Sequence, residues 1–328
     1  MLLRGALVVV GLSLVANQVV LAQGAAANGG AAIPRTPDGR PDLQGIWTYA
    51  TVTPLERPPE FADKPFLTEE EGAAWVANLL QRFNGDTRDP NPVNDLARES
   101  NQFWQEPRTE VARINGRLAT SLIVDPPNGR VPLLSKESAR PTTGPTRADN
   151  PEDRGLGERC LVDSAGPPIV GNVPNSGSYL QIIQTLTHIV LYTEVSNTAR
   201  IVPLAKRDHN PGHLRRWRGD SVGQWDGETL IVETVNFKVG ANLRGYGVGR
   251  NMGVDTGADM RLIERFSLAA GDRLVYDFTV DNPKLFARSW TAQLPMTRST
   301  DRMFENACHE GNISLEFMLR GARAEEKK

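Results

Sequence analysis

The sequence predicts a mainly β protein, an antiparallel meander that forms a barrel or a sandwich, with one N-terminal helix and long loops. From Tyr179 onward, apolar and polar residues alternate in short runs, which is the period of half-buried strands. Short turns separate these runs and no helical pattern intervenes, so consecutive strands are predicted to be antiparallel. We expect strands at 179–184, 188–195, 200–204, 224–234, 262–267, 274–280 and 289–294.

Two dipeptides mark β-hairpins. Asn115-Gly116 separates the apolar runs 111–114 and 118–124, and both central residues of a type I′ turn need a positive φ, which Asn and Gly accept. Asp226-Gly227 gives the same signal inside the run 224–234. The chain is therefore expected to fold back on itself at both places.

One helix is expected, over residues 68–83. Thr68 and Glu71 have the spacing of a capping box, and the glutamates between them suit the positive end of the helix dipole. Val76 and Leu79 begin its apolar stripe, and Asn84-Gly85 ends it. We expect this helix to pack on the outside of a sheet.

The first residues have the pattern of a secretory signal peptide, over residues 1–22. Arg4 precedes a nearly continuous apolar run, and Val20-Leu21-Ala22 is a small-residue cleavage pattern before Gln23. Asn17 and Gln18 interrupt the run, which is short for a bilayer span. We therefore expect a periplasmic or secreted protein with no membrane span once the signal is removed.

The rest of the chain is expected to be a single domain. A Gly/Ala-rich lead over 23–33 buries little, and a single β-rich domain is predicted over 34–323. Within it, residues from about 131 to 157 are rich in Pro, Ser, Thr and Arg, which predicts a long surface loop.

Charge and composition limit the partners. The 37 basic and 39 acidic residues nearly cancel, so the chain has no overall electrostatic attraction for nucleic acid, and we expect none as a partner. Neither a phosphate-binding loop nor a dinucleotide fingerprint is present, and we expect no cofactor. The composition does not predict an oligomeric state.

The two cysteines, Cys160 and Cys308, are expected to form a disulfide, because thiols in an exported chain are usually paired. In the chain-entropy model, a loop of this length contributes up to about 5 kcal/mol. The alternative makes Cys308 a nucleophile next to His309. Neighbours in sequence point to opposite faces of a strand, which places that pair poorly for proton transfer.

A titratable cluster near the C-terminus is the first candidate for a catalytic site. The bridge would hold His309 and Glu310 rigidly, so any activity is expected to depend on them more than on His209 or His213. Glu264 shares a strand face with two large apolar residues, which would raise its pKa unless a remote arginine reaches it. The alternative is that Glu264 is a structural ion-pair residue. Asp220 is the fourth candidate catalytic residue, after His309, Glu310 and Glu264.

Residues for binding a ligand are expected on one face of the strand 188–195. Alternation places His188, Tyr192 and Glu194 opposite Ile189 and Leu191, on a face that is either solvated or lines a polar-edged cavity.

Trp225 and Arg216 are further ligand-binding candidates. The basic cluster 215–218 is expected to brace carboxylates, with an anionic substrate group as the alternative. His209 and His213 are four apart, but Pro211-Gly212 removes the helix that would bring them together, so we expect no metal site.

Several segments resemble known proteins. Gly45-Ile46-Trp47 is similar to the Gly-x-Trp pattern that opens lipocalin-like barrels, in which the tryptophan closes the barrel floor. A larger set resembles a group of exported bacterial proteins of unknown function over 34–323: 37–47 (PDGRPDLQGIW), 121–130, 158–160, 219–221, 225–230 and 307–312 (ACHEGN). This resemblance implies export and a shared fold. That group has arginines where this chain has Val222 and Gln224.

Three functions remain open. The leading expectation is an exported protein that encloses a small organic molecule. The alternatives are a cofactor-free acid–base enzyme, acting as a hydrolase, isomerase or lyase, and a structural envelope protein. Ligand binding without turnover distinguishes the first from the other two.

Overall fold

The computed structural model describes residues 33–82, 110–134, 150–154, 159–161, 166–170, 178–195, 198–204, 208–238, 242–243, 254–255 and 259–326. Residues 32–328 form one compact unit. The expected signal peptide, nearly all of the lead and residues 135–149 and 155–157 of the expected long loop lie outside the described residues.

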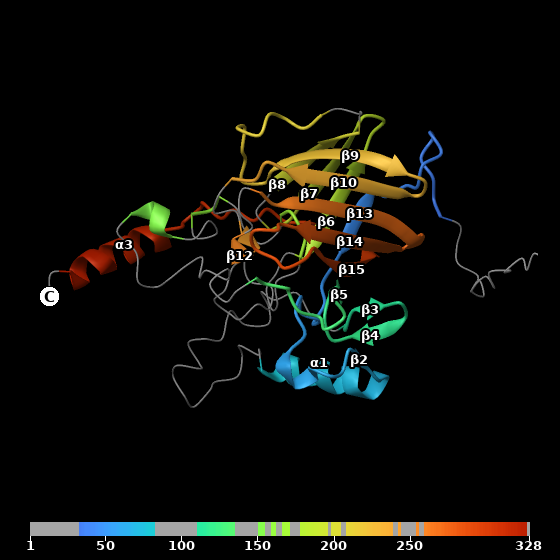
Figure 1. Ribbon diagram of the computed structural model, residues 1–328, viewed down its shortest axis with the longest axis horizontal. Helices are drawn as coiled ribbons and strands as arrows, with labels where there is room; N and C mark the ends of the chain where they lie inside the picture. Colours follow the sequence, from blue (N-terminus) through green and yellow to red (C-terminus); the bar gives the residue numbers. More distant parts are fainter. Residues whose placement is uncertain are drawn as a thin grey trace, which may run out of the picture. The chain divides into compact units, whose positions relative to one another are not determined.

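The protein is mainly β, and its largest sheet is antiparallel, as predicted. The order of strands along this sheet is β8-β7-β6-β1-β15-β14-β13-β10-β9, and β5 also pairs with β15 (Figure 1). The strands are β1 (Gly45–Thr48), β5 (Ile123–Asp125), β6 (Tyr179–Gln184), β7 (His188–Thr193), β8 (Thr198–Pro203), β9 (Asp220–Asp226), β10 (Thr229–Val235), β13 (Arg261–Ala270), β14 (Arg273–Asp281) and β15 (Trp290–Ser299).

Strand β1 joins two meanders into one sheet. Its Trp47 lies opposite Leu180 of β6 on one side and Arg298 of β15 on the other. Trp47 is fully buried and donates a hydrogen bond from Nε1 to the carbonyl of Leu43 at 2.9 Å. The N-terminal strand therefore lies in the middle of the sheet, between segments far away in sequence.

The core lies on one face of this sheet and follows the predicted alternation. In β13, Leu262, Glu264 and Phe266 are fully buried and the residues between them are only partly buried. In β14, alternate residues from Leu274 to Val280 are fully buried. The alternation of buried and partly buried residues in β13 and β14 thus agrees with the period-2 pattern of the sequence.

The two ends of the strand order lie against each other. A Cβ atom added to Gly223 of β9 would lie 3.0 Å from side-chain carbons of both Val202 and Leu204, which belong to β8 and the residue that follows it. Among the described strands, no backbone ladder joins β8 to β9, so hydrogen bonding does not close the sheet into a continuous barrel. The sheet is curled, and side chains at the β8 edge pack against Gly223 of β9.

A second, three-stranded sheet carries the expected helix. It consists of β2 (Phe66–Leu67), β4 (Arg117–Ala119) and β3 (Arg113–Ile114), and it packs against α1 (Glu69–Arg82), shown in blue and green in Figure 1. The capping box is confirmed, because the backbone N–H of Thr68 donates to Glu71 and that of Glu71 donates to Thr68 Oγ1. Asn115 and Gly116 have φ values of 51° and 75° and form the predicted turn.

The structure differs from the predictions in three places. The second hairpin turns one residue later, at Gly227-Glu228, because Thr229 pairs with Asp226. The run 118–124 is not one strand, because the hydroxyl of Ser121 accepts the backbone N–H of Ile123 and diverts the chain from a ladder. The helix α3 (Ser314–Glu325) was not predicted, and it contains no buried residue.

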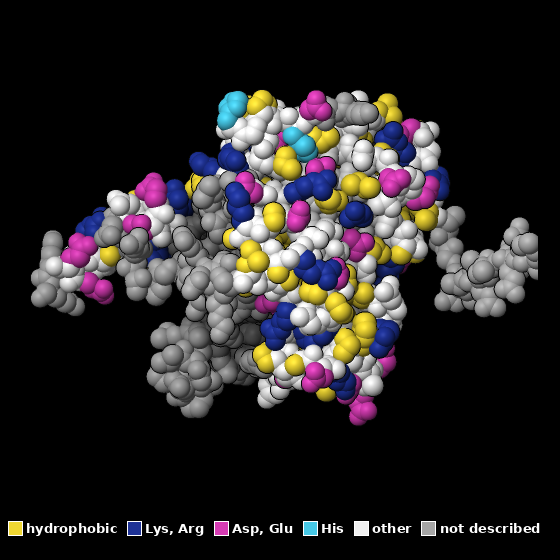
Figure 2. Space-filling model, in the orientation of Figure 1, with side chains coloured by type: hydrophobic (Ala, Val, Ile, Leu, Met, Phe, Trp, Pro, Cys, Tyr) yellow, Lys and Arg dark blue, Asp and Glu magenta, His cyan; other side chains and the backbone are white. Residues whose placement is uncertain are grey.

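The remaining short elements are the 3₁₀ helices at Pro59–Phe61 and Pro151–Asp153 and the pair β11 (Asn242–Leu243) and β12 (Val254–Asp255). Basic and acidic side chains are interspersed on the face shown in Figure 2. Within the described residues, no helix has the length and apolar content needed to cross a bilayer.

Candidate functional site

A buried polar network crosses the interior of the main sheet. Arg200 of β8 donates two hydrogen bonds to Glu264 of β13, from Nη1 to Oε2 at 2.5 Å and from Nη2 to Oε1 at 2.8 Å. Tyr276 of β14 donates its hydroxyl to the same carboxylate at 2.7 Å. The side chain of Arg200 is 10% exposed and that of Glu264 is fully buried. Arg200 is thus the remote arginine that the sequence required for Glu264.

The network also fixes a segment that precedes β6. The backbone N–H of Ile169 donates to the hydroxyl oxygen of Tyr276 at 2.9 Å. Burial raises the pKa of Tyr276 well above its ordinary value, and the neighbouring charge of Glu264 raises it further. Tyr276 therefore stays protonated, donating to Glu264 and accepting from Ile169.

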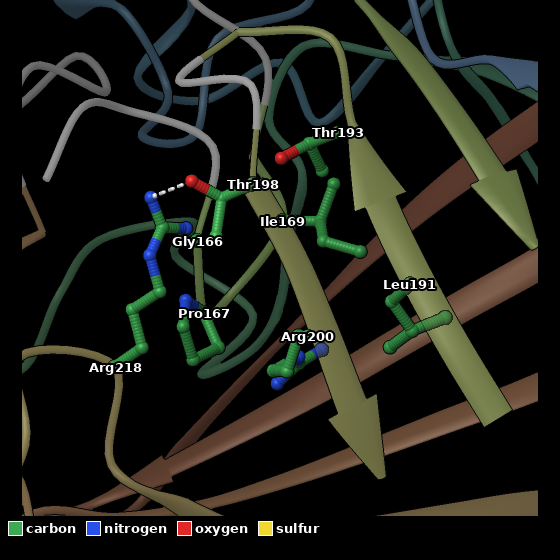
Figure 3. Close-up of a pocket in the computed structure, with 8 residues that line it drawn as sticks. All are labelled: Gly166, Pro167, Ile169, Leu191, Thr193, Thr198, Arg200 and Arg218. Carbon is green, nitrogen blue, oxygen red and sulfur yellow. Dashed lines mark hydrogen bonds between the residues drawn. The ribbon is translucent and has the colours of Figure 1, made fainter. Parts of the chain in front are cut away.

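A small pocket lies next to this network (Figure 3). The enclosed space is about 10 Å³, which is room for about one water molecule, and the recess opens to solvent; counted with that open space it measures about 210 Å³. The strands β7 and β8 supply one wall and the segment 166–169 supplies another. Its lining consists of Gly166, Pro167, Ile169, Leu191, Thr193, Thr198, Arg200 and Arg218.

Two arginines supply the charged part of the pocket lining. Arg200 lines it from β8, where Thr198 and Val202 share its inward-facing side. Arg218 lies in the loop before β9 and donates from Nη2 to Thr198 Oγ1 at 2.9 Å. A Cβ atom on Gly166 would lie only 2.5 Å from Nη1 of Arg218, so the guanidinium packs directly against this glycine.

A second polar cluster lies at the start of β9. Asp220 is 3% exposed, and its carboxylate accepts hydrogen bonds from the backbone N–H of Asn210 at 2.9 Å and from the Asn210 amide at 2.5 Å. Nδ1 of His209 lies 3.1 Å from Asp220 Oδ2. A buried carboxylate that holds one imidazole nitrogen leaves the other available for proton transfer. The cluster therefore has the geometry of an oriented general base.

The structure separates the catalytic residues predicted from the sequence. His309 and Glu310 are exposed in a turn before α3, while Glu264 is fully buried among the sheet strands. Among the described residues, no contact joins His309 or Glu310 to Glu264 or Asp220. The predicted disulfide is present, with the Cα atoms of Cys160 and Cys308 5.8 Å apart.

The predicted ligand-binding residues lie outside the pocket. His188 is exposed, and Tyr192 lies on the face of β7 opposite the pocket residue Leu191. Glu194 follows the strand and is buried, and it accepts the backbone N–H of Phe304 at 2.6 Å. Arg216 is exposed and Trp225 is partly buried, and neither lines the pocket.

Sequence reasoning missed the residues that build the pocket. Arg200 carries a usable signal, because it alternates with the buried Val202 in a predicted strand and so had to face inward. Arg218 belongs to the recognised basic cluster, but its target could not be inferred. Tyr276 lies within the expected strand 274–280, although its bond to Glu264 depends on strand pairing.

Neither the protein-family models nor the curated proteins give a match.

Proposed function

We propose that this protein binds a small organic molecule inside the curled main sheet, in the pocket beside Arg200 and Arg218. One observation carries the proposal: oriented polar groups and an apolar wall meet in the same recess. The bidentate bond to Glu264 holds Arg200 in place before any ligand arrives, so little side-chain entropy remains to be lost on binding. Pockets with a few fixed polar groups among apolar ones are typical of ligand sites.

The proposal includes a lipocalin-like use of the sheet, as a barrel that side chains rather than a backbone ladder complete. The contact of Gly223 with Val202 and Leu204 supports it, as does the ion pair between β8 and β13. Arg298 of β15, in the middle of the strand order, also supports it through its contact with Trp47. Its guanidinium lies 4.4 Å from the ring centre of Trp47, and its Nη1 donates to the carbonyl of Gln44 at 2.6 Å.

We propose further that the protein is exported to the periplasm or secreted. The signal-peptide pattern over residues 1–22 and the intramolecular disulfide support this. Cell fractionation followed by N-terminal sequencing tests it, and the expected mature N-terminus is Gln23. A full-length cytoplasmic protein would contradict export.

Thermal shift measurements test ligand binding. A panel of small acids, amides, alcohols and sugars is screened, and at least one class is expected to raise the melting temperature. Leu191→Phe fills the pocket and should abolish the shift, although overpacking itself costs about 1–3 kcal/mol. Val190→Phe, the neighbouring residue on the outward face, is the matched control and should retain it. A panel with no effect would contradict the proposal and leave the structural envelope protein as the alternative.

A second candidate function, acid–base catalysis, is favoured by the geometry of His209 and Asp220. The carboxylate would keep Nδ1 of His209 protonated, so that Nε2 accepts a proton from a bound substrate or water. Activity on a panel of small esters and lactones tests this. His209→Ala should lower the rate of any turnover by about 10²–10⁴-fold, while His213→Ala and His309→Ala should leave the rate unchanged. Turnover that survives His209→Ala would contradict this assignment.

A further inference from the structure

We infer that the ligand of this pocket is a small carboxylic acid, bound as its carboxylate between Arg200 and Arg218. This inference rests on the proposed function and specifies its ligand class. The evidence is the number of hydrogen-bond donors that face the pocket, their charge, and the apolar surface beside them.

Arg200 has donors to spare. A guanidinium carries five N–H groups in a fixed plane, and the two hydrogen bonds to Glu264 occupy two of them. Among the described residues, Glu264 is the only hydrogen-bond partner of this side chain, which is 10% exposed and lines the pocket. The remaining donors make no hydrogen bond to the described residues, so they are free to bond the acceptor oxygens of a ligand.

Arg218 supplies charge at the same recess. Its Nη2 is bonded to Thr198 Oγ1, which is a neutral acceptor, and both residues line the pocket (Figure 3). The described lining residues include two guanidinium groups and no carboxylate, and an arginine stays charged at every accessible pH. We therefore assign the orienting hydrogen bonds to Arg200, and Arg218 adds a second positive charge to the same lining.

The apolar wall favours an organic acid over an inorganic anion. Pro167, Ile169 and Leu191 lie in the same lining as the guanidiniums. A short hydrocarbon chain would bury its surface against them, at about 25 cal/mol per Å² removed from water. Phosphate has no apolar part to use this wall, and its higher charge costs more to desolvate. A planar carboxylate also matches the planar donors of a guanidinium.

The experiment compares acids with their neutral isosteres. Propionate, butyrate and benzoate are titrated into the full chain by calorimetry, alongside propionamide, butyramide and benzamide. The acids are expected to bind at least about tenfold more tightly, since replacing a charge-assisted hydrogen bond with a neutral one typically costs that much. The amides keep the shape and the hydrocarbon while removing the charge.

Arg218→Gln removes one of the two positive charges, so it should reduce the preference for the acids over the amides and leave the binding of the amides unchanged. Arg216→Gln is the matched control, because Arg216 is exposed two residues away and does not line the pocket. Equal binding of acids and amides by the unmodified protein would overturn the inference, as would equal losses in Arg216→Gln and Arg218→Gln. Should Arg218→Gln fail to fold, the comparison in the unmodified protein still decides.

The two proposals fail in different ways. If amides or other neutral compounds bind and Leu191→Phe blocks them while the acids do not bind, the proposed function stands and the ligand class is wrong. If no compound of any class binds, the proposed function itself is wrong. Binding of acids that Leu191→Phe does not affect would place the acid site elsewhere and overturn the inference.

Discussion

Arg200 and Glu264 form a buried ion pair although β7, β6, β1, β15 and β14 lie between their strands in the order of the sheet. The pair can form only because the sheet curls until β8 and β13 face each other. A buried charge that loses its partner is strongly destabilising, whereas replacing both partners is often tolerated. The ion pair therefore depends on the curl of the sheet, and losing one of its partners should destabilise the fold.

The first prediction concerns this pair. Glu264→Gln leaves Arg200 buried without a counter-charge and should lower the free energy of unfolding by about 3–5 kcal/mol. Adding Arg200→Met should recover part of that loss, because it removes the isolated charge. Urea denaturation of the single and double variants measures the coupling. A loss of less than about 1 kcal/mol in Glu264→Gln would mean that solvent reaches the pair.

The second prediction concerns Tyr276. Tyr276→Phe removes the acceptor of the Ile169 N–H and one donor to Glu264, so it should cost about 1–3 kcal/mol. Tyr179→Phe is the control, since its hydroxyl bonds Asp301 at an exposed position and its loss should fall within about 0.5 kcal/mol. Both are measured by chemical denaturation. Equal losses of stability in the two variants would show that the buried hydrogen bonds of Tyr276 contribute no more than the exposed bond of Tyr179.

Local patterns predicted much of this fold. The 179–184 strand, the Asn115-Gly116 turn and the Thr68–Glu71 capping box each depend on residues close together in sequence, and the structure confirms all three. Alternation also identified Glu264 as an inward-facing carboxylate that needed a remote arginine. These features follow from geometry that acts over a few residues.

The pocket depends on contacts that no local pattern encodes. The position of β1 between β6 and β15 brings residues 45–48 next to segments more than a hundred positions away, and Arg200 reaches Glu264 only through this pairing. Proximity to Cys308 favoured His309 and Glu310 in the sequence. The structure places them in an exposed turn, while it gives His209 a buried carboxylate partner.

The third prediction concerns pH and Glu56. Burial raises the pKa of Glu56, a residue only 8% exposed whose Oε1 accepts the N–H of Val131. A carboxyl with a raised pKa penalises the folded state when it is ionised, so Glu56→Gln should be more stable than the unmodified protein at neutral pH. That advantage should vanish as the pH falls through the raised pKa. A tenfold change in the acid dissociation constant of the carboxyl corresponds to about 1.4 kcal/mol of stability.

Glu69 provides the control of opposite sign. Its hydrogen bonds to Arg113 lower its pKa, so its ionised form stabilises the folded state. Glu69→Gln should therefore be less stable than the unmodified protein at neutral pH, and this deficit should disappear as the pH falls through the lowered pKa. Thermal melts at a series of pH values test both. If the melting temperatures of Glu56→Gln and Glu69→Gln changed with pH in the same direction relative to the unmodified protein, the opposite pKa shifts of the two carboxyls would be contradicted.

The last prediction concerns the disulfide and α3. Phe304 is the last residue of the C-terminal segment with a described bond to a buried side chain, that of Glu194, and α3 beyond it buries no residue. The bridge, the bond from Asn312 Nδ2 to Cys160 Sγ at 3.2 Å and the bond from Arg154 Nη2 to Met318 Sδ at 3.0 Å hold this segment. Such a segment unfolds locally rather than with the core.

Removing the bridge should therefore free the C-terminus without unfolding the sheet. The Cys160→Ser/Cys308→Ser variant should keep its free energy of unfolding within about 1 kcal/mol of the parent, well below the chain-entropy limit of about 5 kcal/mol for a long loop in the cooperative unit. Trypsin should cut faster after Arg320 and Arg323. Mass spectrometry should find the non-reduced parent lighter than its reduced form by the mass of two hydrogens. A stability loss near the limit would place α3 within the cooperative fold.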